Sequence, residues 1–287
     1  MAIEVRQLKP GDDLLLSDFL ESRADSSMFV RSNLRRSGLD DTGLAYSGAY
    51  VGALSGGRVE AVAVLYWSGT LMVQAPYHLG PILQHLTKTA ARPVRGILGP
   101  LDQTDEARRL LGLMKAPLIK ASREDLFALQ LDKLEMPEHL AAGRWTSRRP
   151  RRTELAGLVD WRVLSVTETG AAAQPDERTR ADADEVIRNL DRDGALWVLE
   201  VDGRIVSMNS YNATMPDMVQ IGGVFTPSDL RGLGFARACV AGSLAAARRA
   251  GVKRSVLFTP KENASAQAAY RAIGFRVVGD YGIVMFE

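Results

Sequence analysis

A glycine-rich turn joins a predicted strand to an alanine-rich helix late in the chain, and this junction limits the possible folds most strongly. The turn reads Arg231-Gly232-Leu233-Gly234-Phe235-Ala236, and we expect the helix after it to end near Ala250, before Gly251. Glycines allow the backbone to turn tightly and to direct several N–H groups toward one point. The partial positive charge of the helix N-terminus adds to this field. The junction therefore predicts an α/β fold with a site for a pyrophosphate, in which Arg231 either supplements the backbone donors or packs the turn.

Three phosphate-binding motifs compete for this turn. A P-loop requires Gly-Lys-Ser or Gly-Lys-Thr, and neither follows the turn. A dinucleotide-binding fingerprint requires a small residue where Arg237 stands and an acidic residue about 20 positions later, whereas residues 253–259 contain no acid. The remaining pattern is Arg-x-x-Gly-x-Ala, which Arg231, Gly234 and Ala236 satisfy. A pattern this short often marks only a structural turn, so the surrounding elements have to support it.

The second half of the chain shows a clear succession of elements. Apolar residues at three- and four-residue spacing predict helices, and short apolar runs predict strands. Asp202-Gly203 between two such runs is a strong hairpin signal. Asn263 is a suitable N-cap for a helix that stops at Gly274. We expect helices near 155–166, 178–190, 235–250 and 263–273, strands near 195–201, 204–212, 218–226 and 255–259, and a closing antiparallel pair of 275–278 with 283–286.

The first half shows a weaker copy of the same order. It predicts a helical region at 12–36, strands at 49–54, 59–66 and 70–75, a helix at 79–86, a strand at 95–98, a helix at 104–111 and a strand at 127–131. A chain of 287 residues is long for one domain. We therefore expect two domains, 1–140 and 145–287, with the boundary where Gly143 and a cluster of basic residues interrupt the pattern.

The composition excludes several classes of protein. With 46% hydrophobic and 24% charged residues the chain can bury a substantial core, and a net charge of +2 indicates neither a nucleic-acid nor a membrane partner. Cys239 is the only cysteine, so no intrachain disulfide forms, and the N-terminal residues lack the apolar core of a signal peptide. His78, His85 and His139 are too scattered to predict a metal site. We expect a cytoplasmic protein without a metal, whose oligomeric state the sequence does not indicate.

Together with its flanking residues, the turn resembles the acyl-CoA-binding motif of the GNAT acyltransferase superfamily. Residues 223–227 are similar to that family's fourth strand, whose splayed backbone pairs with the pantetheine arm, and residues 263–275 are similar to its second motif. The resemblance covers about Trp145 to Glu287. It implies an α/β (α+β) fold of two GNAT-like domains in tandem, each a mixed, mostly antiparallel sheet flanked by helices, with a degenerate N-terminal copy. It also implies acetyl-CoA as the acyl donor and a set of cofactor-binding residues, namely Val224, Phe225, Thr226, Arg231, Gly232, Leu233, Gly234, Phe235, Ala236 and Asn263.

The same resemblance assigns Tyr270 as the catalytic acid that protonates the departing thiolate. A phenol with a pKa near ~10 can hydrogen-bond or protonate a thiolate whose conjugate acid has a pKa near ~8.5. Backbone N–H groups of residues 224–226 would hold the thioester carbonyl. The general base stays open, because Gln220 stands on the strand where family members often carry a Glu, and Asp217, the nearest carboxylate, is typical of a turn. Ordered waters, or an amine already neutral in solution, are further alternatives.

The first domain lacks the residues that carry this chemistry. Where the glycine-rich turn would have its counterpart, the chain reads Pro76-Tyr77-His78-Leu79-Gly80-Pro81, and Arg108 falls about where Tyr270 would. We therefore expect only the second domain to bind acyl-CoA and to transfer an acetyl group to an amine of unidentified acceptor. A non-catalytic acyl-CoA-binding regulatory or interaction protein is the alternative. An aminoacyl transferase that uses charged tRNA is a third possibility, against which the intact motif and the modest charge argue.

Overall fold

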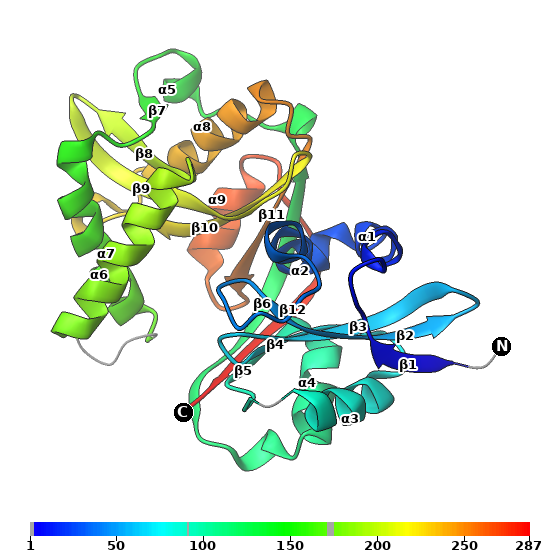
Figure 1. The fold of residues 1–287 in the computed structure, drawn as a ribbon. Coiled ribbons are helices and arrows are strands. Elements are labelled where there is room, and N and C mark those ends of the chain that lie inside the picture. The colour runs from blue at the N-terminus through cyan, green and yellow to red at the C-terminus, as the bar shows by residue number, and fades with distance from the viewer. Residues whose placement is uncertain (1–2, 91, 171–174) are drawn as a thin grey trace. The chain divides into compact units, whose positions relative to one another are not determined.

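The computed structural model describes residues 3–90, 92–170 and 175–287. The chain divides into two compact units (Figure 1): unit 1 contains Met1–Leu126 and Gly279–Glu287, and unit 2 contains Phe127–Val278. Two strands, β6 (Leu118–Gln130) and β12 (Arg276–Phe286), each begin in one unit and end in the other. The last segment of the chain therefore belongs to the unit that the first segment forms.

In unit 1 the sheet has the order β1-β2-β3-β4-β5-β12. Its neighbours are antiparallel except for β4 and β5, which run parallel. Alternation along β3 divides the core, because Ala61 and Ala63 pack with α3, whereas Val62 and Val64 pack with α1 and α2. The elements are β1 Glu4–Gln7, α1 Asp13–Glu21, α2 Ala24–Ser37, β2 Gly48–Ser55, β3 Arg58–Tyr66, β4 Thr70–Gln74, α3 Leu79–Thr89, β5 Gly96–Pro100, α4 Leu101–Leu110 and η1 Leu113–Lys115.

In unit 2 the strands follow the order β6-β11-β10-β9-β8-β7, and β10 and β11 form the parallel pair. Val240, Leu244 and Tyr270 from α8 and α9 belong to one core cluster, and Leu158 and Ile187 from α6 and α7 belong to another. The elements are η2 Leu131–Lys133, α5 Glu138–Ala141, β7 Thr146–Arg148, η3 Arg152–Glu154, α6 Leu155–Glu168, α7 Glu177–Arg192, β8 Leu196–Val201, β9 Arg204–Thr214, β10 Met218–Phe225, η4 Ser228–Leu230, α8 Phe235–Arg249, β11 Arg254–Pro260 and α9 Ala264–Arg271.

Both units follow the element order that the sequence predicts for the two halves. A first short strand leads into a helix pair, then come three strands, a helix, a strand, a helix and a final strand. The short first strands β1 and β7 are absent from the prediction, because each contains at most four residues and neither is buried throughout. The hairpin signal is confirmed, since Asp202 and Gly203 connect β8 to β9 with φ angles of 49° and 76°.

The predicted closing hairpin is wrong. Instead of two short strands at 275–278 and 283–286, β12 is one continuous strand from Arg276 to Phe286. Its residues Tyr281–Met285 pair antiparallel with Pro100–Gly96 of β5. Tyr281, Val284 and Phe286 are buried, so a partner far away in sequence supplies the hydrogen bonds and apolar contacts that a local turn would have supplied.

The division into units also differs from the expected domain limits at 140 and 145. The change of unit falls at Leu126–Phe127, and the C-terminal Gly279–Glu287 is part of unit 1. The basic segment that suggested a boundary is structured within unit 2, where β7 pairs antiparallel with Val198–Glu200 of β8.

The structure also bears on a membrane span, a metal site and a reactive cysteine. Within the described ranges, no helix combines the length and apolar character needed to cross a membrane, and no three His, Cys, Asp or Glu side chains gather as metal ligands would. Cys239 is fully buried in α8, and burial raises the pKa of its thiol, so the residue serves packing rather than nucleophilic attack.

Candidate functional site

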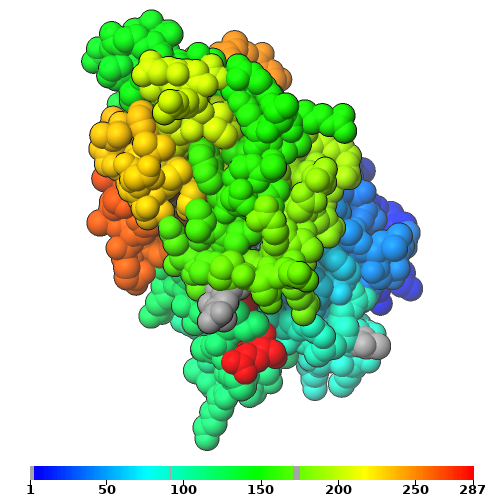
Figure 2. Space-filling model, turned by 90° about the vertical axis from the view of Figure 1, so that its left-hand side faces the viewer, coloured from blue at the N-terminus to red at the C-terminus, as the bar shows by residue number. Residues whose placement is uncertain are grey.

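The loop between β10 and α8 gathers free backbone donors at the surface of unit 2. Gly232 and Gly234 have φ angles of 79° and 82°, a region that favours glycine, and Gly234 is the N-cap of α8. In the described part of the chain, the N–H groups of Gly232, Leu233 and Gly234 have no protein acceptor. Residues 235–236 begin α8, whose first N–H groups lack intrahelical acceptors. Figure 2 shows the yellow-to-orange stretch after β10 at the surface beside the green helices α6 and α7. The loop thus presents donors to an anion at the positive end of the helix dipole.

The side chain of Arg231 braces this loop. Its Nε donates to the Thr226 carbonyl oxygen at 2.9 Å, and its Nη2 lies 2.6 Å from Glu168 Oε2 at the end of α6. The guanidinium carbon lies 5.8 Å from the centre of the Phe225 ring. Of the two roles that the sequence left open, these contacts favour packing of the turn.

Strand pairing along β10 is interrupted just before the loop. Gly222 is paired with β9, the next pair involves Phe225, and Gly223 and Val224 stand outside the ladder. The parallel pairing with β11 extends over Met218–Gln220. Within the described residues, the backbone of Gly223 and Val224 therefore has no ladder partner on either neighbouring strand. Such an interruption is what an extended ligand needs in order to add its own hydrogen bonds.

Two glycines make this interruption possible. A Cβ at Gly222 would lie 1.9 Å from Asn212 Nδ2, and one at Gly223 would lie 2.7 Å from Ser210 Oγ. Gly223 also has a φ of 55°. The side chains of β9 thus lie directly against the backbone of β10, and no larger residue fits there without rearrangement.

Phe225 and Thr226 fix the end of β10 through their side chains. The Phe225 ring is buried and lies 6.1 Å from the Trp161 ring of α6, centre to centre. Thr226 Oγ1 donates to Ser207 Oγ at 3.0 Å, and Ser207 Oγ donates to the Phe225 carbonyl oxygen at 3.0 Å. The side chains of the two residues therefore hold the backbone at the end of β10 in place, and their contact with a cofactor stays a prediction.

Asn263 caps α9 as its position in the sequence indicates. Its Oδ1 accepts hydrogen bonds from the Ala266 N–H and from Ser265 Oγ, both at 3.0 Å. The capping role is confirmed, and a contact of Asn263 with a cofactor stays a prediction.

Tyr270, the predicted acid, is mostly buried in unit 2. Its side chain is 8% exposed, and its ring packs in T-shaped geometry against Phe127 and Phe275 at 6.2 and 6.0 Å. The ring of Tyr270 is therefore part of the hydrophobic core, and the catalytic role of its hydroxyl stays a prediction.

The structure adds no general base to the two residues considered from sequence. Gln220 is 1% exposed, and its Oε1 has no hydrogen-bond partner among the described residues. The carbonyl oxygen of Asp217 accepts from the N–H groups of Lys253 and Arg254 at 2.9 and 3.1 Å, which ties the start of β10 to the start of β11, and the role of the carboxylate stays a prediction.

The side chain of Arg237 lies beside the glycine-rich loop. A Cβ placed on Gly234 would lie 3.2 Å from Arg237 Nη2, so the guanidinium covers the N-cap of α8. In the sequence, Arg237 stands out only as a departure from the dinucleotide fingerprint. Its position three residues after the N-cap, on the same side of the first helical turn, was the available signal.

Unit 1 closes the corresponding position with its own side chains. After β4, the Ala75 N–H donates to Gln103 Oε1 at 2.6 Å, and Gln103 is 7% exposed in the first turn of α4. The N-cap of α3 is His78 with a φ of 60°, and Pro81 in the first turn has no N–H. This segment of unit 1 thus has one backbone donor occupied after β4 and one donor missing in the first turn of α3.

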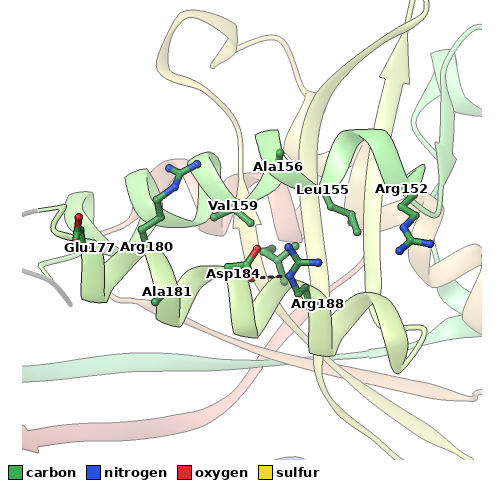
Figure 3. Close-up of a pocket in the computed structure, with 10 residues that line it drawn as sticks. Arg152, Leu155, Ala156, Val159, Glu177, Arg180, Ala181, Asp184 and Arg188 are labelled. Atoms are coloured by element: carbon green, nitrogen blue, oxygen red, sulfur yellow. Dashed lines mark hydrogen bonds and ion pairs between the residues drawn. The ribbon is translucent and has the colours of Figure 1, made fainter.

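A groove of about 510 Å³ runs between α6 and α7 (Figure 3). Arg180 of α7 lies 2.6 Å from Asp160 of α6, and within α7 Arg188 lies 2.6 Å from Asp184. The hydrogen bond from Arg188 lowers the pKa of Asp184, which makes this carboxylate a weak base. The groove shares no residue with the predicted cofactor set. Its lining is Arg152, Leu155, Ala156, Val159, Glu177, Arg180, Ala181, Asp184, Ile187 and Arg188.

Comparison with known proteins identifies the same part of the chain. Residues 158–275 match the family model described as acetyltransferase (GNAT) family. A search of curated proteins finds no match.

Solved structures resemble the chain over nearly its whole length. A Drosophila protein is 14% identical with a TM-score of 0.69, covering 98% of both chains. A GCN5-related N-acetyltransferase from Sphaerobacter thermophilus is 18% identical with a TM-score of 0.57, covering 98% of this chain and 94% of its own. A tandem GNAT protein of the clavulanic acid biosynthesis pathway is 15% identical with a TM-score of 0.54, covering 99% and 97%. At these identities the likeness concerns the fold. Residues 158–275 form a GNAT acetyltransferase domain.

Proposed function

We propose that unit 2 transfers an acyl group, acetyl in the simplest case, from acyl-CoA to an amine. The observation that carries this proposal is the glycine-rich loop inside the GNAT domain, whose N–H groups lack protein acceptors and lie at the N-terminus of α8. A CoA pyrophosphate matches these donors in charge and in hydrogen-bonding capacity. The unpaired backbone of Gly223 and Val224 on β10 supplies the donors and acceptors that a pantetheine amide arm requires.

In this proposal the chain mainly positions the reactants. Backbone N–H groups at the end of β10 hold the thioester carbonyl and stabilise the negative charge that develops when the amine nitrogen attacks its carbon. The carbon–sulfur bond then breaks, the acyl group stays on nitrogen, and the thiolate leaves with the electron pair. The hydroxyl of Tyr270 hydrogen-bonds or protonates that thiolate. Because Gln220 cannot take a proton, the attacking amine loses its proton to solvent.

Unit 1 has a supporting role in this proposal. After β4, Gln103 occupies the Ala75 N–H, and Pro81 removes a donor from the first turn of α3. We therefore propose one acyl-CoA site per chain and tandem GNAT-like units of which only the second binds the donor.

A non-catalytic acyl-CoA-binding protein is the second candidate, favoured by Gln220 in place of a carboxylate and by the packing of Tyr270 in the core. Release of free CoA thiol from acetyl-CoA, measured against a panel of primary amines, separates the two. Amine-dependent release above the rate of hydrolysis supports transfer. Binding of acetyl-CoA without release by any amine supports the second candidate.

Tyr270→Phe tests the acid role within the same assay. We expect kcat to fall about 10²-fold, within the range for loss of a general acid, while the affinity for CoA changes little. Tyr77→Phe, at an exposed tyrosine of unit 1, serves as the control and should leave kcat unchanged. Unchanged turnover in Tyr270→Phe would remove the residue from the mechanism.

A further inference from the structure

Arg237 is a cation without a protein counter-charge, next to the loop described above. Its Nε is buried, and neither this atom nor the rest of the guanidinium has a hydrogen-bond or ion-pair partner among the described residues. The neighbouring arginine of the loop differs, because Arg231 has both a carbonyl and the Glu168 carboxylate as partners.

The position of Arg237 is electrostatically unfavourable in the protein alone. The residue lies in the first turn of α8, where the helix dipole already concentrates positive charge. No acidic residue stands in that turn. A buried Nε–H without an acceptor adds a desolvation cost. An anion bound between Arg237 and the loop would remove both costs at once.

We propose that Arg237 binds the pyrophosphate of the acyl-CoA donor, and this inference rests on the proposed function. Its guanidinium covers Gly234, with Nη2 3.2 Å from where a Cβ on that residue would lie. The guanidinium therefore lies beside Gly234, the last of the three loop residues whose N–H groups have no protein acceptor among the described residues. Since Arg231 is engaged in bracing the turn, Arg237 supplies the side-chain charge and the backbone supplies the remaining donors. The third residue of α3 in unit 1 is Pro81, which offers neither a cationic side chain nor an N–H.

The test compares the binding of CoA and of 3′-dephospho-CoA by calorimetry, with wild type, Arg237→Gln, Arg237→Lys and Arg249→Gln. Arg249→Gln is the matched control, because it removes the same charge from the last turn of the same helix. For Arg237→Gln we expect the Kd for both ligands to rise about 10- to 100-fold, as for a lost charge-assisted hydrogen bond. Arg237→Lys should recover part of that loss, and Arg249→Gln should stay within about twofold of wild type.

A measurement on the free protein separates binding from a structural role. Without ligand, the thermal midpoint of Arg237→Gln should equal or exceed that of wild type, because the substitution removes an unpaired cation. A lowered midpoint would make Arg237 a structural residue and overturn the inference. Unchanged affinity in Arg237→Gln would also overturn it, and a loss with CoA alone would place the contact at the 3′-phosphate instead. If the wild type binds neither ligand, the proposed function itself fails.

Discussion

The C-terminal strand completes the sheet of the first unit, and this arrangement makes a sharp prediction about two valines on β12. Val284 is 6% exposed and belongs to the core cluster of unit 1, whereas Val278 on the same strand is 48% exposed and belongs to unit 2. Replacing each by alanine makes the same chemical change in two different environments.

The expected magnitude follows from burial. Val284→Ala deletes two buried carbon groups at about 0.8 kcal/mol each and leaves a small cavity, so we expect a loss of about 2–3 kcal/mol in the free energy of unfolding. For a unit of this size the thermal midpoint should fall by roughly 6–10 °C. Val278→Ala should change the free energy of unfolding by less than about 0.5 kcal/mol.

Urea unfolding and amide hydrogen exchange measure the size and the place of the effect. In Val284→Ala we expect β2, β3, β4 and β5 to lose protection, although the substituted residue follows all of unit 2 in sequence. Equal destabilisation by both variants, or lost protection in β8–β11 with β2–β5 unchanged, would refute the assignment of Gly279–Glu287 to unit 1.

Two further predictions concern single positions. Gly274→Ala would place a Cβ 2.7 Å from the Lys133 carbonyl oxygen at a φ of 101° and should destabilise unit 2 by about 1–3 kcal/mol, whereas Gly157→Ala on α6, with open space around it, should be neutral or stabilising in the same thermal melts. The hydrogen bonds from Arg6 lower the pKa of Asp12 from 3.8 to about 2, so this pair stabilises the folded state above pH 3.8 and the contribution is lost as the pH falls toward 2. Urea midpoints of Asp12→Asn should therefore lie below those of wild type at neutral pH and converge with them near pH 2; parallel pH profiles would contradict this.

Features set by a few neighbouring residues could be predicted from the sequence. The turn at Asp202-Gly203 needs two positive φ angles, which this pair adopts at little cost, and the cap at Asn263 needs an oxygen within reach of a backbone N–H three residues ahead. The glycines of the loop could be predicted as well, because glycine adopts a positive φ without steric cost. The element order of both halves is predictable because hydrophobic periodicity is also a local property.

Features that depend on distant partners could not be predicted in this way. The apolar residues at the end of the chain fit a hairpin or one long strand equally well, and only the pairing with β5 decides between them. The occupation of the Ala75 N–H by Gln103 joins residues that no spacing rule connects. The Arg231 side chain had two open roles until its Glu168 partner, 63 residues away, was known.

Calorimetric binding of acetyl-CoA to wild type and to Gly234→Trp tests the central claim most directly. Gly234 has a φ of 82°, so a tryptophan there is strained and also covers the loop. The account predicts one site per chain in wild type and no detectable binding in the variant, with unit 2 still folded as judged by its thermal midpoint. Absence of binding in wild type, or equal binding by both proteins, would contradict the assignment of the glycine-rich loop as the acyl-CoA site.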